Sequence, residues 1–278
     1  MKQYTPQYTV KKIYQDTYAI SDNGIGQGKV FMYLLAGKEK ALLIDSGFGL
    51  LDLKAITASI TDKEVICACT HGHVDHALGA SQFQEAYLHS RDFEVYKRHT
   101  NPQLITEMGM KGLLMKPPKS MLQNPSYVKL VEKLAQTQHE PLKALDDIKQ
   151  FDLGDRIVSW RLVPGHTQGS AVFIDEKYNT VFDADAAPVG VWLFLAESSP
   201  LPEYIAELNS YLAFLRESGV KNRYLGHAGT PLKIKSLHNL IRCTELAIAK
   251  PGLGIKTNSI FGPVRIIFAK GTLMFCRG

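Results

Sequence analysis

Three histidines and one aspartate fall within six consecutive residues of this chain, directly after an apolar run. The apolar run is 65–69, and the cluster that follows it consists of His71, His73, Asp75 and His76. Imidazole nitrogens and carboxylate oxygens bind cations such as zinc, and one short loop positions several of them at little entropic cost. A polar surface turn is the alternative, but it gives no reason for so many metal-competent groups after a buried-looking strand. The cluster therefore predicts a metal site at a strand end.

The spacing within the cluster indicates more than one metal ion. Residues two apart on an extended segment project to the same side, so His71 and His73 point together. The adjacent Asp75 and His76 aim in different directions. One loop can thus contribute ligands to two neighbouring metals, but it rarely completes the coordination shell of either. Further ligands are expected from later strands.

Three later segments supply candidate ligands at strand ends. His166 follows an apolar run through a Pro-Gly turn, and His227 follows a glycine after a short apolar run. Asp183 and Asp185 stand at the end of a third run. Taken singly, a histidine after a strand is more often a hydrogen-bonded turn residue than a ligand. Together with the first cluster, these segments predict one metal site.

The same motifs resemble those of the metallo-β-lactamase superfamily, including its glyoxalase-II-like and lactonase-like metallo-hydrolases. The family signature His-x-His-x-Asp-His corresponds to residues 71–76, and its later ligand motifs correspond to His166, Asp185 and His227 in the same order. The resemblance runs from about the first strand to the C-terminal quarter of the chain. It implies an α/β protein with the four-layer αββα sandwich of that family and a helical insertion.

Two positions depart from the family pattern. The family segment Leu-Ile-Asp-Thr-Gly corresponds to residues 43–47, where Ser46 replaces the threonine. The family usually has Gly-Asp where this chain has Ala184 and Asp185. We assign the ligand that bridges two metals to Asp185 in preference to Asp183.

The resemblance implies a pair of divalent metal ions held by seven side chains. One metal is assigned to His71, His73 and His166, and the other to Asp75, His76 and His227, with Asp185 bridging them. Asp45 is expected to accept a hydrogen bond from the far nitrogen of a ligand imidazole, and a strand-ending carboxylate in a Ser-Gly turn is the competing interpretation. Zinc is the expected metal, with iron and manganese as alternatives because they accept the same ligands.

Such a site favours hydrolysis. Two cations that share a water lower its pKa from about 15.7 towards neutrality and polarise a carbonyl or phosphoryl oxygen. We therefore predict a dinuclear metal-dependent hydrolase of a small ester, thioester or lactone, with a metal-bridging hydroxide as the nucleophile. Asp75 is the candidate catalytic residue that protonates the leaving group, and a metal-bound water is the alternative proton donor.

Other activities are kept as alternatives. A phosphodiesterase acting on nucleic acid or a phosphorylated small molecule uses the same metals. A mononuclear iron persulfide dioxygenase has a similar ligand motif, whereas oxygen-reducing relatives usually have glutamate at the position of His73. A nonenzymatic ligand-binding protein on the same fold is disfavoured because no ligand is missing. β-Lactam hydrolysis is not expected of a chain without an export signal.

The composition fits one packed protein. The chain has 278 residues, 45% of them hydrophobic, and we expect a single domain over 1–278 with an insertion at 90–150. A net charge of +5 is too weak to predict nucleic-acid binding. Residues 1–12 lack a signal-peptide core, and the apolar stretch 186–196 is about half of the roughly 20 residues that cross a bilayer. We expect a cytoplasmic protein with a small-molecule substrate and no nucleic-acid or membrane partner, and a homodimer is left open.

Hydrophobic periodicity predicts the main elements. Apolar residues recur at helical spacing over 203–217 and 236–249. Strands are expected over 8–14, 29–35, 40–45, 157–163, 171–175 and 180–183. The apolar faces of the sheets and the single apolar stripe of each helix must be buried against one another. Two facing sheets flanked by helices satisfy this requirement.

The remaining predictions concern the insertion and some isolated residues. A helix in the insertion is expected to begin at Asn124, and the apolar stretch 107–116 either roofs the metal site or packs as a helical subdomain or dimer contact. Segment 189–195, with Trp192 and Phe194, is interpreted as a buried strand, with a wall of the site as the alternative. The histidines without partner motifs are expected on the surface or on helices: His89, His99, His139 and His238.

Overall fold

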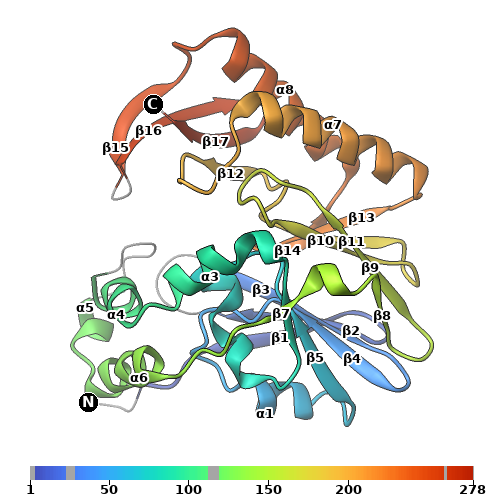
Figure 1. Ribbon diagram of the computed structural model, residues 1–278, viewed down its shortest axis with the longest axis vertical. Coiled ribbons are helices and arrows are strands. Elements are labelled where there is room, and N and C mark those ends of the chain that lie inside the picture. The colour runs from blue at the N-terminus through green and yellow to red at the C-terminus, as the bar shows by residue number, and fades with distance from the viewer. Residues whose placement is uncertain (1–3, 23–28, 112–118, 260–261, 278) are drawn as a thin grey trace. The chain divides into compact units, whose positions relative to one another are not determined.

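The computed structural model describes residues 4–22, 29–111, 119–259 and 262–277 (Figure 1). The chain forms two compact units. The first unit comprises residues 1–157 and 227–229, and the second comprises residues 158–226 and 230–278. Each unit combines β-sheet with helices, so the α/β class expected from the sequence is confirmed. No helix among the residues described is long and apolar enough to cross a membrane.

The first unit is built around a sheet with the strand order β1-β2-β3-β4-β5-β6-β7. Strands β1 to β4 pair antiparallel, and β4 to β7 pair parallel. The strands of this unit are β1 Tyr8–Tyr14, β2 Thr17–Asp22, β3 Val30–Ala36, β4 Lys40–Ile44, β5 Glu64–Ala68, β6 Ala86–Leu88, β7 Lys143–Ala144 and β8 Gln150–Asp152. Because β4 and β5 are parallel, the residues that follow them lie at the same edge of the sheet. Asp45 therefore lies beside the loop that begins at Cys69, and its N–H donates to the carbonyl of Ala68 at 3.0 Å.

Helices cover the first unit's sheet and fill most of its segment 90–150. They are α1 Leu53–Ala58, α2 Val74–Ala77, α3 Phe93–His99, α4 Pro102–Lys111, α5 Lys119–Leu122 and α6 Pro125–Gln136, with 3-10 turns η1 Leu78–Gln82, η2 Ser90–Asp92 and η3 Leu145–Asp147. As predicted, Asn124 caps α6, and its Oδ1 accepts from the N–H of Ser126 at 3.0 Å. Helices α4 and α6 pack so closely that a Cβ on Gly109 would lie 2.6 Å from Cγ1 of Val131. The C-terminal part of the apolar stretch 107–116 lies outside the described residues, so its role as a roof stays a prediction.

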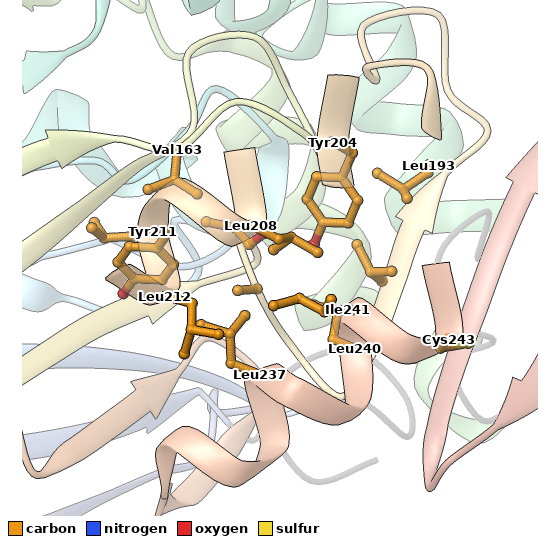
Figure 2. Close-up of a cluster of buried hydrophobic side chains, with 14 of the residues drawn as sticks. Val163, Leu193, Tyr204, Leu208, Tyr211, Leu212, Leu237, Leu240, Ile241 and Cys243 are labelled. Carbon is orange, nitrogen blue, oxygen red and sulfur yellow. The ribbon is translucent and has the colours of Figure 1, made fainter. Parts of the chain in front are cut away.

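The second unit contains the strands β14-β13-β11-β10-β9 of a six-stranded sheet, together with two long helices. Their bounds are β9 Ile157–Leu162, β10 Ala171–Asp175, β11 Thr180–Ala184, β13 Asn222–Leu225, β14 Ala228–Leu232, α7 Leu201–Glu217 and α8 Ile234–Ala249. Figure 2 shows the core between these elements, where Tyr204, Leu208 and Tyr211 of α7 meet Leu237 and Leu240 of α8. Both helices fall where the hydrophobic periodicity predicts them, and their apolar stripes are buried.

A further sheet completes the second unit, and periodicity did not predict most of it. Its order is β12-β17-β16-β15, and the strands are β12 Gly190–Leu193, β15 Ile255–Ser259, β16 Gly262–Ala269 and β17 Thr272–Arg277. Strands β12 and β17 are parallel, and the other pairs are antiparallel. Helix α8 packs against β16 and β17 (Figure 1). We call this sheet the C-terminal sheet.

Candidate metal centre

The loop between β5 and α2 positions the first cluster of predicted ligands. His73, the N-cap residue of α2, has an extended backbone conformation. The loop passes so close to α3 that a Cβ on Gly72 would lie 2.8 Å from the carbonyl oxygen of Asp92, and the N–H of Gly72 donates to Oδ2 of Asp92 at 2.9 Å. These contacts fix the loop, and the side chains of His71, His73 and His76 are buried.

Asp45 fixes the orientation of the His76 ring. Its Oδ2 lies 2.8 Å from Nδ1 of His76, and its Oδ1 accepts from the N–H and the hydroxyl of Thr70 at 2.7 and 2.9 Å. A carboxylate can only accept, so Nδ1 of His76 holds the hydrogen and Nε2 presents its lone pair. Asp45 has a φ of 63°, a left-handed conformation in which aspartate is several-fold enriched among non-glycine residues. The hydrogen bond predicted for Asp45 is present.

The same chain of hydrogen bonds reaches His71. Because Thr70 gives its hydroxyl hydrogen to Asp45, its oxygen accepts from Nδ1 of His71 at 3.1 Å. The ring centroid of His71 lies 4.2 Å from that of His76 and 4.7 Å from that of His73. His71 and His76 therefore adopt the same tautomer, with Nε2 as the atom suited to a metal.

His227 belongs to the first unit and lies beside Asp75. Its Nδ1 lies 3.1 Å from the carbonyl oxygen of Lys29, which again leaves the Nε2 lone pair as the ligand atom. Nε2 of His227 is 3.4 Å and Nε2 of His76 is 3.5 Å from Oδ2 of Asp75. The ligand atoms of Asp75, His76 and His227 all lie within 4.8 Å of one another. Two imidazoles and a carboxylate oxygen are a donor set that fits a divalent cation such as zinc.

His99 is a neighbour of this cluster that the sequence reading missed. It lies on a helix, as expected, but its Nδ1 accepts from the N–H of Val74 at 3.1 Å. Its ring stacks on that of His73, with centroids 4.8 Å apart and planes 24° from parallel. His99 therefore supports both the first turn of α2 and the face of a predicted ligand. Nothing in the local sequence indicates this contact, because His99 and Val74 are separated by two helices and a strand.

In the second unit, His166 and Asp185 face each other. Nε2 of His166 lies 3.8 Å from Oδ2 of Asp185, and Nδ1 of His166 lies 2.8 Å from the carbonyl oxygen of Trp192. The carbonyl can only accept, so His166 also has its hydrogen on Nδ1. Ala184 adopts a φ of 43°, a conformation that favours glycine. This backbone conformation explains why glycine usually stands before the bridging aspartate.

Asp183, the competing carboxylate, has a structural position. It is fully buried, its Oδ2 accepts from Nε of Arg223 at 2.7 Å, and its Oδ1 accepts from the hydroxyl of Tyr211 at 2.6 Å. Burial, and then the charge of Asp183, raise the pKa of Tyr211 well above its usual value, so the phenol stays a donor. Asp183 thus neutralises a buried arginine, and Asp185 is the carboxylate that faces His166.

The seven predicted ligands fall into two sets. The first unit brings together His71, His73, Asp75, His76 and His227, and the second unit brings together His166 and Asp185. Four of the imidazoles have their tautomer fixed by a hydrogen bond at Nδ1. Fixed tautomers of this kind are typical of histidines that bind metals.

A family model described as the metallo-beta-lactamase superfamily matches residues 25–227. The chain belongs to the metallo-β-lactamase superfamily. Its structure is similar to that of DIM-1 metallo-beta-lactamase, with a TM-score of 0.60, 15% identity, and coverage of 88% of this chain and 100% of that chain. It is also similar to the metallo-beta-lactamase from Pontibacter korlensis, with a TM-score of 0.59, 13% identity, and coverage of 86% and 99%. The predicted metallo-β-lactamase type of fold is therefore confirmed.

Curated relatives in the superfamily have a thioesterase name. The chain is 23% identical over 240 residues to "Acyl-coenzyme A thioesterase MBLAC2" of Homo sapiens, and the matched region covers 82% of each protein. It is 22% identical over 237 residues to the protein of the same name from Gallus gallus, and the matched region covers 82% of this chain and 81% of that one. The similarity therefore extends over most of both chains.

Proposed function

We propose that this superfamily member is a metal-dependent hydrolase of thioesters. The observation that carries the proposal is the similarity to proteins named acyl-coenzyme A thioesterases over about four fifths of both chains. The donor set of Asp75, His76 and His227 supports it, because its atoms lie at distances that suit a shared cation. In the reaction, water adds to the carbonyl carbon and the C–S bond breaks, which yields a carboxylic acid and a thiol.

The proposed centre takes its ligands from both sets. His71, His73 and His166 would hold one divalent metal ion, Asp75, His76 and His227 a second, and Asp185 would bridge them. When bound, such metals supply an activated water at neutral pH and polarise the carbonyl of the substrate. Zinc is the first candidate for both positions, and iron and manganese suit the same donors.

The chain's own residues prepare the ligands for this task. Asp45 and Thr70 hold the rings of His76 and His71, and the carbonyls of Lys29 and Trp192 do the same for His227 and His166. Each contact places the hydrogen on Nδ1 and makes Nε2 the atom that would bind a cation, so little reorganisation would be needed on binding. The proposal therefore gives a role both to the predicted ligands and to the residues that orient them.

Asp75 has a second proposed role, as the proton donor to the leaving group. A thiol has a pKa near 8.5, so a thiolate departs with little assistance at neutral pH, whereas the alkoxide of an ester or lactone needs a proton as it leaves. Because Asp75 is also assigned as a metal ligand, its capacity to donate a proton is limited, and the centre is better suited to thioesters than to esters. Hydrolysis of an oxygen ester or lactone with higher kcat/KM than the matched thioester would contradict this reasoning.

The test combines metal analysis with a substrate panel. We expect about two metal ions per chain and hydrolysis of an acyl thioester that is lost on chelation and restored by metal. His166→Ala and His227→Ala should each lower the metal content and reduce kcat by more than 100-fold, as loss of a metal would. His238→Ala is the matched control, because His238 lies on α8 and contacts Arg216.

The panel also separates the alternatives. A phosphodiester cleaved faster than any thioester, or a persulfide oxidised by a protein holding a single iron, would overturn the thioesterase proposal. Full metal content and full activity in both His166→Ala and His227→Ala would reject the assigned ligands. Metal binding without turnover of any member of the panel would favour a nonenzymatic role.

A further inference from the structure

The two faces of the C-terminal sheet have different surroundings. Alternate residues of a strand point to opposite faces. The residues of one face are buried in the core of the second unit beside α8: Val191, Leu193, Ile267, Met274 and Cys276. The intervening residues form the opposite face, which we call the outer face. Its exposed large hydrophobic residues include Phe268 at 76% and Ile255 at 71%.

Strand register aligns apolar side chains across the outer face. Trp192 of β12 lies opposite Phe275 of β17, Phe275 lies opposite Ile266 of β16, and Ile266 lies opposite Ile255 of β15. Residues that are opposite in register share a face, so these side chains form one row across the whole sheet. Three strand spacings separate its ends, a distance of about 14 Å. We call it the Trp192–Ile255 row.

The row begins at a predicted metal ligand. The carbonyl of Trp192 holds Nδ1 of His166 at 2.8 Å, so the strand that starts the row also orients that imidazole. The indole ring contacts Phe194 and Phe275, with centroid distances of 5.4 and 5.9 Å. An apolar row thus extends from beside His166 to Ile255; its first three side chains are partly buried and Ile255 is exposed.

We infer that the Trp192–Ile255 row binds the acyl chain of the substrate, an inference that rests on the proposed thioesterase function. An acyl chain is apolar and extended, and it must leave the reacting carbonyl in some direction. The row offers only apolar side chains and starts beside a residue assigned to the metal centre. Its far end, Ile255, is 71% exposed, so an apolar chain lying along the row would remove that side chain's surface from water.

A second copy of the chain fits this face less well. Beyond the row, the outer face adds the pair Phe268 and Leu273, and it ends at Arg277 on one side and at the turn of Lys270 on the other. Two rows across these strands cover roughly 200 Å². A stable dimer buries about 800 Å² per partner, so the apolar part of this face is too small to form one.

The binding mode predicts how activity depends on acyl length. Full burial of one methylene increases affinity about fourfold. A methylene lying on an open face is about half buried and contributes about half of the corresponding binding free energy, which is an increase of about twofold. kcat/KM should therefore rise about twofold per methylene in straight acyl thioesters of one thiol until the chain passes Ile255. The rise should then stop.

Two matched substitutions locate the far end of the row. Ile255→Ser should remove the gain in kcat/KM that the longest acyl chains otherwise show. Ile248→Ser is the control, because it makes the same change at a partly exposed position on α8, away from the outer face. Loss of the gain in Ile248→Ser, or its retention in Ile255→Ser, would overturn the proposal.

Tryptophan fluorescence gives a readout that does not require turnover. The chain has two tryptophans, so Trp160→Phe makes Trp192 the sole emitter. Titration with straight-chain fatty acids should shift its emission, with tighter binding for longer acids and weaker binding of long acids when Ile255→Ser is added. No shift with any acid would overturn the inference.

The outcomes separate this inference from the proposed function. Hydrolysis of the acetyl thioester without dependence on chain length leaves the thioesterase proposal standing and rejects the row. Fatty-acid binding without hydrolysis of any thioester rejects the thioesterase and retains an apolar-ligand site. A dimer that Ile255→Ser converts to a monomer identifies the outer face as a protein interface and rejects acyl binding.

Discussion

Oδ2 of Asp45 lies 2.8 Å from Nδ1 of His76, and the same carboxylate accepts two hydrogen bonds from Thr70. One buried side chain therefore sets the tautomer of one predicted ligand directly and that of His71 through the Thr70 hydroxyl. Removal of the negative charge of Asp45 should therefore affect both imidazoles, although neither histidine is itself replaced.

The first prediction is that Asp45→Asn weakens metal binding roughly 10- to 100-fold, the usual cost of removing a residue that orients a metal-binding histidine. Asparagine tolerates the left-handed backbone of Asp45, so the fold should be retained. Chelator competition measures the affinity, and circular dichroism checks the fold. An unchanged affinity would show that Asp45 only ends its strand.

The second prediction concerns the buried pair of Asp183 and Arg223. Asp183→Asn should lower the free energy of unfolding by about 3–5 kcal/mol, because it leaves the guanidinium buried without its counter-charge. Glu85→Gln, which breaks the exposed contact of Glu85 with Lys143 at 2.7 Å, should cost less than about 1 kcal/mol. Urea denaturation of both variants gives the comparison, and equal costs would contradict this assignment of Asp183.

The third prediction concerns pH. Burial lowers the pKa of His139 and of His89 below the ordinary value of about 6.5. Between the folded and unfolded pKa values of these histidines, the unfolded chain binds more protons than the folded chain. The free energy of unfolding is therefore highest above pH 6.5 and decreases as the pH falls through the lower folded pKa. His139→Phe should flatten the fall in the free energy of unfolding between about pH 7 and 5. The measurement uses metal-free protein so that metal release does not contribute, and an unchanged slope would contradict it.

Local sequence signals were enough to predict several elements. Strand β1 has the predicted bounds, β4 ends one residue earlier than predicted, and α7 and α8 each begin two residues earlier. These segments have regular apolar periodicity, and their ends are marked by turn residues such as Pro251 and Gly252. The cap at Asn124 followed from a local rule that needs no tertiary information.

Long-range partners could not be predicted in this way. Arg223 and Asp183 are 40 residues apart and meet only because β11 and β13 are neighbours in the sheet. The C-terminal sheet was missed for a similar reason, since β15 to β17 mix exposed polar and apolar residues and gain their pattern from α8 on one face. Segment 189–195 was interpreted as a buried strand, whereas Trp192 in it is only partly buried.

The chain passes between its two units three times, after residues 157, 226 and 229, because His227 to Gly229 return to the first unit. No single cut can therefore divide the gene into halves that each keep their own residues. A fragment ending at residue 157 would lack the imidazole that faces Asp75. The first unit therefore acquires its last three residues only after the chain has run through most of the second unit.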